Sequence, residues 1–291
     1  MKMYAKVLAD SIYAPHNVYG RVITIEATNP KFIDAECEKH GNLRSNSSSS
    51  RAIPTDRLLK QVREDPYLPE DVRLNQRGMQ GDNKIKDVLK SMFHSHLFDL
   101  ADHVSNEVVN YSKILEIHKQ HVNRYIEPFT VQCKVITANY EDWMSMLKLR
   151  LAEDADPNIQ EWARNIQSAI LESESTLLKY DEWHLPYVTS SQRQQFTDEE
   201  CRCISVSRCA SVSYYKQGVD KTIEEDIKKT EMLANSGHWS CFEHQLTPML
   251  NFDCNDSEWP DGVSAYSREG YGMSGAFKRW VCFRNLLSSK K

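Results

Sequence analysis

Apolar and polar positions alternate along several stretches of this chain, with the period of a strand that buries one face. Residues 5–36 open with two such runs, and in the second Ile23, Ile25 and Ala27 alternate with polar or smaller neighbours until Asn29-Pro30 ends it. The stretches 129–138 and 203–215 alternate in the same way. The pattern predicts strands at all of these places, with Cys203 and Cys209 on one face of the last.

Apolar residues recur every three, four or seven positions along four other stretches, which predicts amphipathic helices. The longest covers about 82–125 and ends before Glu127-Pro128. The others cover 139–150, 157–180 and about 221–236, where Asn235 and Gly237 provide the stop.

Two segments interrupt these patterns. Residues 39–54 read KHGNLRSNSSSSRAIP, with four consecutive serines. Low complexity is typical of a flexible linker, but this stretch is short, lies between periodic segments and carries several basic and amide side chains. Residues 180–195 are the best candidate for a crossover or linker, and the tail 260–291 is rich in glycine, serine and aromatic residues before a basic end.

Composition and charge argue against a disordered, a nucleic-acid-binding or a membrane-spanning protein. The 291 residues are 40% hydrophobic and carry 36 Lys and Arg against 41 Asp and Glu, a formal charge of −5, so we expect a globular chain with no nucleic-acid partner. No apolar run approaches the ~18 residues of a membrane span, and charged residues interrupt the N-terminal apolar stretch, which does not read as a signal peptide. We therefore expect a cytoplasmic protein without membrane contact.

Only 10 residues are glycine, and neither GxGxxG nor GxxxxGK[ST] occurs. Glycine-rich loops let the backbone approach phosphate in two common nucleotide-binding folds. If this chain binds phosphate, side chains must do it.

Metal binding finds little support. The tight cluster Cys201, Cys203 and Cys209 lacks paired CxxC spacing, so we expect thiols packed in a reducing compartment. Five histidines fall within 82–125, but no carboxylate or cysteine completes a HExxH-type set. We predict no metal site.

Three groups of residues could carry chemistry. Ser47–Arg51, with Lys39, His40, Arg44 and Asn46, offers hydroxyls and bidentate guanidinium donors for phosphate, the alternative being a solvated loop. His238, Glu243 and His244 form a second group, in which a carboxylate could orient imidazole or bind ribose. Arg124 and Arg150 form the third; each could instead pair with a carboxylate or cap helical carbonyls.

Together these groups resemble the flavin-dependent thymidylate synthases, the ThyX family, over most of the chain, and especially a longer branch from phages and some bacteria. The family hallmark RHRxxSxNxxSxR aligns with Lys39-His40-Gly41-x-x-Arg44-x-Asn46-x-x-Ser49-x-Arg51, which keeps the histidine, asparagine, second serine and last arginine. NSSSSRAIP (46–54) is similar to the longer branch almost throughout.

Other segments support the same resemblance. Four segments look like family segments: NRYIEPF (123–129), the run 139–150 ending MLKLR, RLNQRGMQ (73–80) and EWHLPYV (182–188). In addition, SRCASVSY (207–214) resembles the ARVSY strand, and GHWSCFEHQ (237–245) resembles the GHxSPFEH turn at the flavin. The last two follow the hallmark, whereas in the shorter form they precede it, so the element order looks circularly permuted.

The resemblance implies an α+β fold: one large domain with a mixed sheet and long helices, of which 1–180 would carry the nucleotide and flavin motif and 196–291 the ARVSY and FEH segments. It also implies a homotetramer with active sites shared between subunits. The implied reaction is reductive methylation of dUMP at C5 to dTMP, with FAD, NADPH and methylenetetrahydrofolate. The resemblance further implies that no cysteine acts as a nucleophile.

The resemblance also implies roles for particular residues. Ser49, Arg150 and His238 would be catalytic, with Arg150 favouring ionisation of the pyrimidine at N3. The implied nucleotide-binding residues are Glu36, Lys39, Ser47, Ser48, Ser49, Ser50, Arg51, Arg124 and Arg150. The implied flavin-binding residues are Lys39, His40, Arg44, Asn46, Asn139, Ser145, His238, Ser240 and Glu243.

The chain departs from the family at several of these positions. Gly41 replaces an arginine that touches flavin, Ser145 replaces a flavin-binding asparagine, and Cys241 replaces the proline of the FEH turn. Arg44 could supply the cation missing at Gly41. Two other interpretations stay open: a pyrimidine deoxynucleotide C5 hydroxymethylase or methylase acting on dUMP or dCMP, for example one encoded by a phage and working in the bacterial cytoplasm, and an inactive flavin- or nucleotide-binding homologue.

Overall fold

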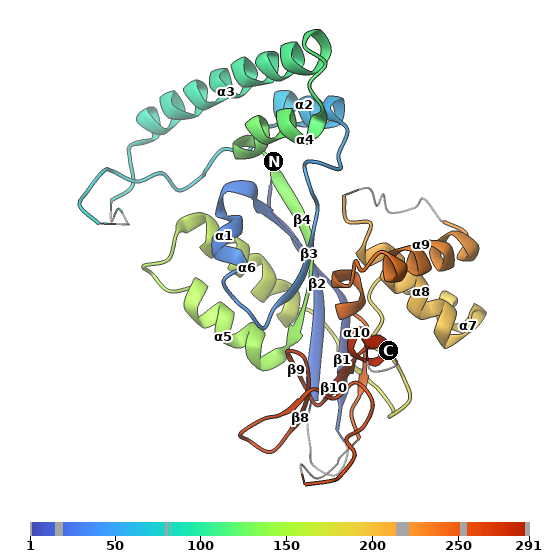
Figure 1. The fold of residues 1–291 in the computed structure, drawn as a ribbon. Coiled ribbons are helices and arrows are strands. Elements are labelled where there is room, and N and C mark those ends of the chain that lie inside the picture. The colour runs from blue at the N-terminus through green and yellow to red at the C-terminus, as the bar shows by residue number, and fades with distance from the viewer. Residues whose placement is uncertain are drawn as a thin grey trace.

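A computed structural model describes residues 2–14, 20–78, 81, 83–213, 221–250 and 255–288. It combines helices with a mixed sheet, which confirms the α+β class (Figure 1). The division into halves at 1–180 and 196–291 stays a prediction.

The elements follow one another as strands, helices and short helical turns. The strands are β1 (Ala5–Tyr13), β2 (Gly20–Pro30), β3 (Arg44–Ser47), β4 (Val131–Asn139), β5 (Thr176–Leu177), β6 (Leu246–Pro248), β7 (Ala265–Tyr266), β8 (Gly272–Ser274), β9 (Phe277–Lys278) and β10 (Trp280–Cys282). The helices are α1 (Asp34–Cys37), α2 (Thr55–Glu64), α3 (Asp87–Val109), α4 (Lys119–Val122), α5 (Tyr140–Arg150), α6 (Pro157–Leu171), α7 (Ser190–Gln195), α8 (Asp198–Cys209), α9 (Ile223–Asn235) and α10 (Phe283–Ser288). The short turns are η1 (Lys31–Ile33), η2 (Asn110–Ile114), η3 (Asn123–Phe129) and η4 (Ser240–Glu243).

The main sheet has the order β3-β4-β2-β1-β5. Its centre is the antiparallel pair β2 and β4, in register from Val22 opposite Asn139 to Pro30 opposite Val131. Strand β3 pairs antiparallel with β4 and forms one edge, while β5 pairs in parallel with two residues of β1 at the other. The predicted strands at 5–36 and 129–138 are confirmed.

Both faces of this sheet are covered, which explains why β2 and β4 are buried along most of their length. On one face Ile23, Ile25 and Ile136 pack with Trp143 of α5 and Trp162 of α6. On the other face Val135 packs against side chains of α8 and η4, namely Val206, Cys209, Cys241 and Phe242. Figure 1 shows α5 and α6 on one side of the strands and α8 and α9 on the other.

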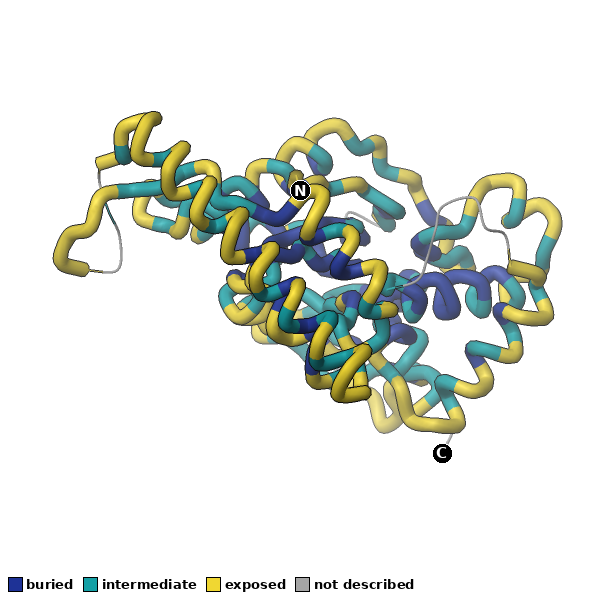
Figure 2. Tube along the Cα trace, turned by 90° about the horizontal axis from the view of Figure 1, so that it is seen from above, coloured by how far each residue is buried: buried dark blue, intermediate teal, exposed yellow. Residues whose placement is uncertain are grey.

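A separate helical lobe formed by α2, α3 and η3 has its own small core. Leu58, Val62, Ala101, Val108 and Ile126 are among its buried members. The first half of α3 reaches beyond this core, so large apolar side chains such as Val88 (72% exposed) and Met92 (55% exposed) face outward. Figure 2 shows the helices nearest the viewer mostly exposed, with buried positions gathered deeper in the molecule.

The strand predicted at 203–215 is wrong, because residues 198–209 form helix α8. Thr197 and Glu200 make a capping box that starts this helix. Buried residues follow almost continuously from Ile204 to Cys209 because α8 is enclosed by the sheet and α9, so its sequence shows no clean helical period. Tyr214 and Tyr215 of the predicted strand lie outside the described residues.

Two predicted helices are shorter than expected, whereas those at 139–150 and 221–236 are confirmed. The helix predicted over 157–180 ends at Leu171, because the hydroxyls of Ser173 and Ser175 donate to Asp10 at 2.8 and 2.9 Å and lead the chain into β5. The helix predicted over 82–125 is divided into α3, a π-helical turn at η2, and α4, with Glu116 at positive φ between them. Within the described part of the chain, no helix is both long and apolar enough to cross a bilayer.

A chain of buried hydrogen bonds crosses the sheet near its middle. His184, from the predicted crossover segment, shares hydrogen bonds with Ser11 at 2.9 Å and Thr24 at 2.7 Å. Thr24 shares one with Thr137 at 2.7 Å, and Thr137 shares one with His244 at 2.8 Å. Both imidazoles are fully buried, and burial lowers the pKa of each to about 3.

These two histidines should make the fold less stable as the pH falls below about 6.5, the ordinary pKa that they regain in the unfolded chain. Because the unfolded chain then binds protons that the fold excludes, each histidine removes about 1.4 kcal/mol of unfolding free energy per pH unit. Denaturant unfolding between pH 6.5 and 5 measures this slope. His184→Gln should make the slope shallower and His96→Gln, on the exposed surface of α3, should leave it unchanged; equal slopes in the wild type and His184→Gln would contradict the assignment.

Candidate functional site

The segment 39–54, called the Ser-rich segment below, is an ordered part of the fold. Its first half enters β3, where Asn46 lies opposite Val135 of β4. Ser48 extends this pairing, since its N–H donates to the carbonyl of Cys133 at 2.8 Å and its hydroxyl accepts from the N–H of Cys133 at 3.0 Å. The segment is therefore held along a sheet edge.

Residues of η3 fix the second half of the Ser-rich segment. The Asn123 amide donates to the carbonyls of Ser50 and Ile53 at 2.8 and 3.0 Å, and the hydroxyl of Ser50 donates to Glu127. Ser48 and Ser50 thus use their hydroxyls within the chain. The hydroxyls of Ser47 and Ser49 have no partner in the part of the chain that the structure describes, so they are the ones available to a ligand.

The turn at 237–245 and the end of α8 meet the Ser-rich segment on the other face of the sheet. The hydroxyl of Ser240 donates to Asn46 Oδ1 at 2.7 Å, and the same amide donates through Nδ2 to the carbonyl of Cys209 at 2.9 Å. The N–H of Ser49 donates to the hydroxyl of Ser213 at 3.0 Å. Two segments more than 150 residues away in the sequence are thereby joined to this edge.

The C-terminus of α5 meets the beginning of the Ser-rich segment. Arg150 donates through Nε to His40 Nε2 at 2.8 Å and through Nη2 to the carbonyl of Glu36 at 2.8 Å. Because His40 accepts through Nε2, its neutral imidazole carries the proton on Nδ1. Burial, and then the Arg150 cation, holds the pKa of His40 below its ordinary value. Glu36 Oε2 is buried with no partner among the described residues.

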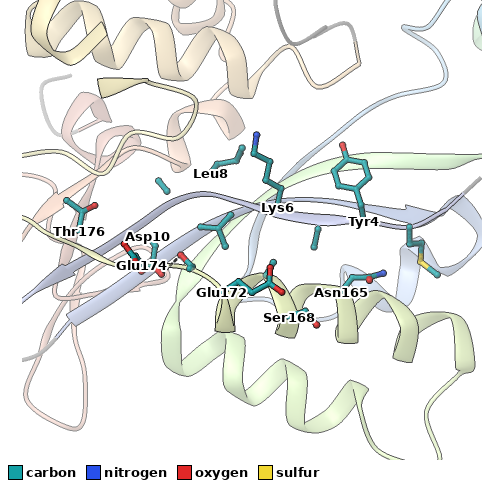
Figure 3. A pocket seen from close by; sticks show the side chains of 15 residues that line it. Tyr4, Lys6, Leu8, Asp10, Asn165, Ser168, Glu172, Glu174 and Thr176 are labelled. Atoms are coloured by element: carbon teal, nitrogen blue, oxygen red, sulfur yellow. Dashed lines mark hydrogen bonds between the residues drawn. The ribbon is translucent and has the colours of Figure 1, made fainter. Parts of the chain in front are cut away.

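A hollow of about 230 Å³ opens beside this contact. Its walls include His40, Gly41, Asp142 and Ser145, so two of the predicted flavin-binding residues line it. A larger hollow, of about 650 Å³, lies between β1 and α6 and contains none of the predicted site residues (Figure 3). Of these two hollows, only the smaller one therefore contains predicted site residues, His40 and Ser145.

A buried charge cluster underlies the site. Lys134 of β4 is 1% exposed, and its ammonium bonds to Asp34 at the start of α1 and to Glu38 just after its end. Burial alone would lower the pKa of Lys134, but the two carboxylates raise it overall. The hydroxyl of Ser45 also donates to Glu38, at 3.0 Å. This cluster fixes α1, and with it Glu36, against the sheet.

The other predicted residues are placed as follows. Asn139 is buried and donates to the carbonyl of Lys278 at 3.2 Å, while its Oδ1 has no partner among the described residues. Glu243 forms an ion pair with Arg284 at 2.6 Å. Arg44 is half-buried on β3, and the remaining side chains are exposed: Lys39, Arg51, Arg124 and His238. Their ligand-binding roles stay predictions.

Sequence reasoning missed several residues of this site. Lys134 shares the polar phase of the alternation in β4 with Gln132, so the pattern indicated an exposed lysine and not a buried cation that needs carboxylate partners. Asn123 lies inside a recognised motif, but nothing in the sequence indicated that it holds the Ser-rich segment. Arg284 carried no signal beyond the basic character of the tail.

Among the described residues, no group of three His, Cys, Asp or Glu side chains is arranged to hold a metal ion. The seven cysteines in the described ranges are free, five of them buried and two half-buried.

Comparisons with known proteins found neither a matching family model nor a matching curated protein. Solved structures do match. One is a UMP/dUMP methylase, PolB, from Streptomyces cacaoi bound with 5-Br UMP, at 13% identity and a TM-score of 0.48, over 59% of this chain and 89% of that chain. Another is Thymidylate Synthase X (ThyX) from Helicobacter pylori with FAD and dUMP, at 13% identity and a TM-score of 0.36, over 51% of this chain and 67% of that chain.

The contact between Arg150 and His40 can be tested by titration. The pKa of His40, followed by NMR, should lie below 6.5 in the wild type, and Arg150→Gln should move it upward because the neighbouring cation is removed. Lys148→Gln, at an exposed position of the same helix, is the matched control and should leave the titration unchanged. A His40 pKa that does not respond to Arg150→Gln would show that the two side chains are not in contact.

Proposed function

We propose that this chain is a flavin-dependent thymidylate synthase-like enzyme that methylates dUMP at C5, using FAD, NADPH and methylenetetrahydrofolate. The observation that supports it most strongly is that four separate segments resembling the family bond to the Ser-rich segment. Arg150 contacts His40, Ser240 contacts Asn46, Ser213 contacts Ser49, and Asn123 contacts Ser50. Motifs recognised independently in the sequence thus converge on one edge of the sheet.

In this proposal Arg150 binds the pyrimidine. A guanidinium has five N–H donors, and the bonds to His40 and the carbonyl of Glu36 use only two. The same two bonds fix the direction of the cation, which can then stabilise negative charge that develops at N3 of the base. The unpartnered carboxylate oxygen of Glu36 supplies an acceptor at the same place.

The phosphate of the nucleotide would lie against the free hydroxyls of Ser47 and Ser49 and the exposed guanidinium of Arg51. Arg124 is exposed. It lies in η3 with Asn123 and Glu127, which bond to the Ser-rich segment. Guanidinium groups bind phosphate oxygens in a bidentate manner without a glycine-rich loop. This arrangement fits the low glycine content of the chain.

The residues of the smaller hollow and of the FEH-like turn would hold FAD. His40, Ser145, Asn46 and Ser240 offer hydrogen-bonding groups there, and the buried Oδ1 of Asn139 lacks a partner in the described chain. When bound, FAD supplies the reducing equivalents of the reaction. Lys39 and Arg44, which flank this stretch in sequence, would stabilise the reduced, anionic flavin in the absence of the arginine that Gly41 replaces.

The proposal also includes self-association. Large apolar side chains on the first half of α3, among them Val88, Met92 and Phe93, are exposed, although such groups gain about 1.5–3 kcal/mol each when buried. A second copy of the chain is the partner that we propose, as part of a homotetramer.

Self-association through α3 predicts that Met92→Glu combined with Phe93→Glu reduces the mass of the assembly measured by light scattering after gel filtration. Two buried carboxylates in an apolar interface are strongly unfavourable. Asp99→Lys, at an exposed polar position on the same helix, should leave the mass unchanged. A wild type that elutes as a monomer at all concentrations would refute this part of the proposal.

The proposed activity predicts that the purified protein binds FAD and oxidises NADPH in the presence of dUMP, with dTMP as product. Removing a group that stabilises developing charge costs about 10²–10³-fold in rate, so Arg150→Ala should lose that much in kcat/KM. Lys148→Ala is the control on the same helix, and circular dichroism checks that both variants fold.

The other outcomes have clear meanings. FAD binding with a hydroxymethylated product, or activity on dCMP, would identify the related C5 transferase instead. FAD or nucleotide binding without turnover would identify an inactive homologue. Unchanged kcat/KM in Arg150→Ala would remove Arg150 from the mechanism.

A further inference from the structure

Two lysines meet on one serine hydroxyl near the Ser-rich segment. Lys229 of α9 donates from Nζ to Ser211 Oγ at 2.6 Å, and Lys221, which precedes α9, donates to the same oxygen at 3.4 Å. Ser211 follows α8, so the contact joins the end of α8 to the middle of α9. None of these three residues was assigned a role above.

This arrangement brings two ammonium groups to one hydroxyl oxygen. Neither lysine forms an ion pair with a carboxylate in the described chain. The carboxylate of Asp226, which is 1% exposed and whose pKa burial raises, interacts with Lys229 electrostatically but forms no ion pair with it. Burial, and then the charge of Lys221, lowers the pKa of Lys229 to about 8.

The geometry excludes a serine nucleophile activated by lysine. Ser211 is 2% exposed, and its hydroxyl donates to the carbonyl of Ser207 at 2.6 Å. A substrate cannot reach this oxygen. Each ammonium, by contrast, has three N–H donors and uses only one on Ser211, which leaves donors for an external acceptor.

The pair lies close to the phosphate-binding residues proposed above. Ser213, two residues beyond Ser211, accepts from the N–H of Ser49 at 3.0 Å, and its carbonyl accepts from Arg57 at 3.5 Å. The paired lysines therefore bond to a residue two positions before the one that contacts Ser49. An anion between them would relieve the repulsion of the two ammonium groups.

We propose that Lys221 and Lys229 form a second phosphate-binding point that takes a phosphoryl group of a bound nucleotide. The identity of that nucleotide rests on the proposed function, whereas the anion site itself rests only on the two lysines and Ser211. The two lysines would supply cations that the family hallmark, which lacks some of its arginines here, does not provide.

The first test measures binding of inorganic diphosphate to the flavin-free protein by calorimetry at low salt, because screening weakens such contacts. Lys229→Met and Lys221→Met should each weaken binding about tenfold, equivalent to about 1.4 kcal/mol. Lys228→Met, at the exposed neighbouring position of α9, is the matched control and should bind like the wild type. Wild-type affinity in Lys229→Met would overturn the proposal.

A second measurement separates binding from a structural role. Removing one of two repelling cations should leave the thermal unfolding temperature of the anion-free protein unchanged or raise it, so a lower value for Lys229→Met would assign the lysine to the fold and overturn the proposal. Parallel titrations with dUMP and FAD identify the source of the phosphoryl group. The ligand whose affinity falls in Lys229→Met is the one that places its phosphoryl group at this site. If diphosphate binds in a Lys229-dependent manner but FAD and dUMP do not, the anion site stands and the proposed enzyme function fails.

Discussion

The ammonium of Lys134 is the constraint on which the candidate site depends. It lies on the middle strand pairing of the sheet, almost fully buried, where an unpaired charge would cost several kcal/mol. Asp34 and Glu38 meet that need from the two ends of α1, so a helix of only four residues is fixed in place. These ion pairs fix the positions of Glu36 and of the chain that leads to His40. Arg150 donates hydrogen bonds to both residues.

Edge strand β3 gives the site its other fixed element. A strand edge normally offers unpaired backbone groups, but here η3, η4 and the residues after α8 cover the Ser-rich segment with side-chain bonds. Ser48 and Ser50 hold the loop while Ser47 and Ser49 remain free. One run of identical residues is thus divided into structural and available hydroxyls, according to which neighbour each meets.

The sequence was sufficient to predict elements whose apolar residues recur with a regular period, even where both faces are covered, as in β2 and β4. Strands β2 and β4 and helices α5 and α9 were found in this way, because alternation or helical spacing survives in them. Helix α8 was mistaken for a strand because the sheet and α9 enclose it, and a helix buried on most sides loses its period. The end of α6 at Leu171 depends on Asp10, more than 150 residues away, which no local pattern could reveal.

The site could be predicted only as a set of candidate residues, not as an arrangement. Resemblance brought Glu36, His40, Asn46 and Ser240 to attention, but the contacts among them depend on folding. Lys134 and Arg284 were missed because their importance lies in partners distant in sequence, Asp34 and Glu243. Tertiary pairing of charges has no local signature.

The cations of this chain differ in whether a carboxylate pairs with them, and the paired ones stabilise the fold. Arg21 is bound by Asp10, Lys31 by Asp34, and Lys134 by two carboxylates, and all of these hold the sheet and α1 together. Within the described residues, several cations that form no ion pair lie in the Ser-rich segment (Lys39, Arg44 and Arg51), in η3 (Arg124) or on Ser211 (Lys221 and Lys229). A formal charge of −5 is therefore compatible with an anionic ligand, because attraction at a site depends on local uncompensated charge and not on the sum over the chain.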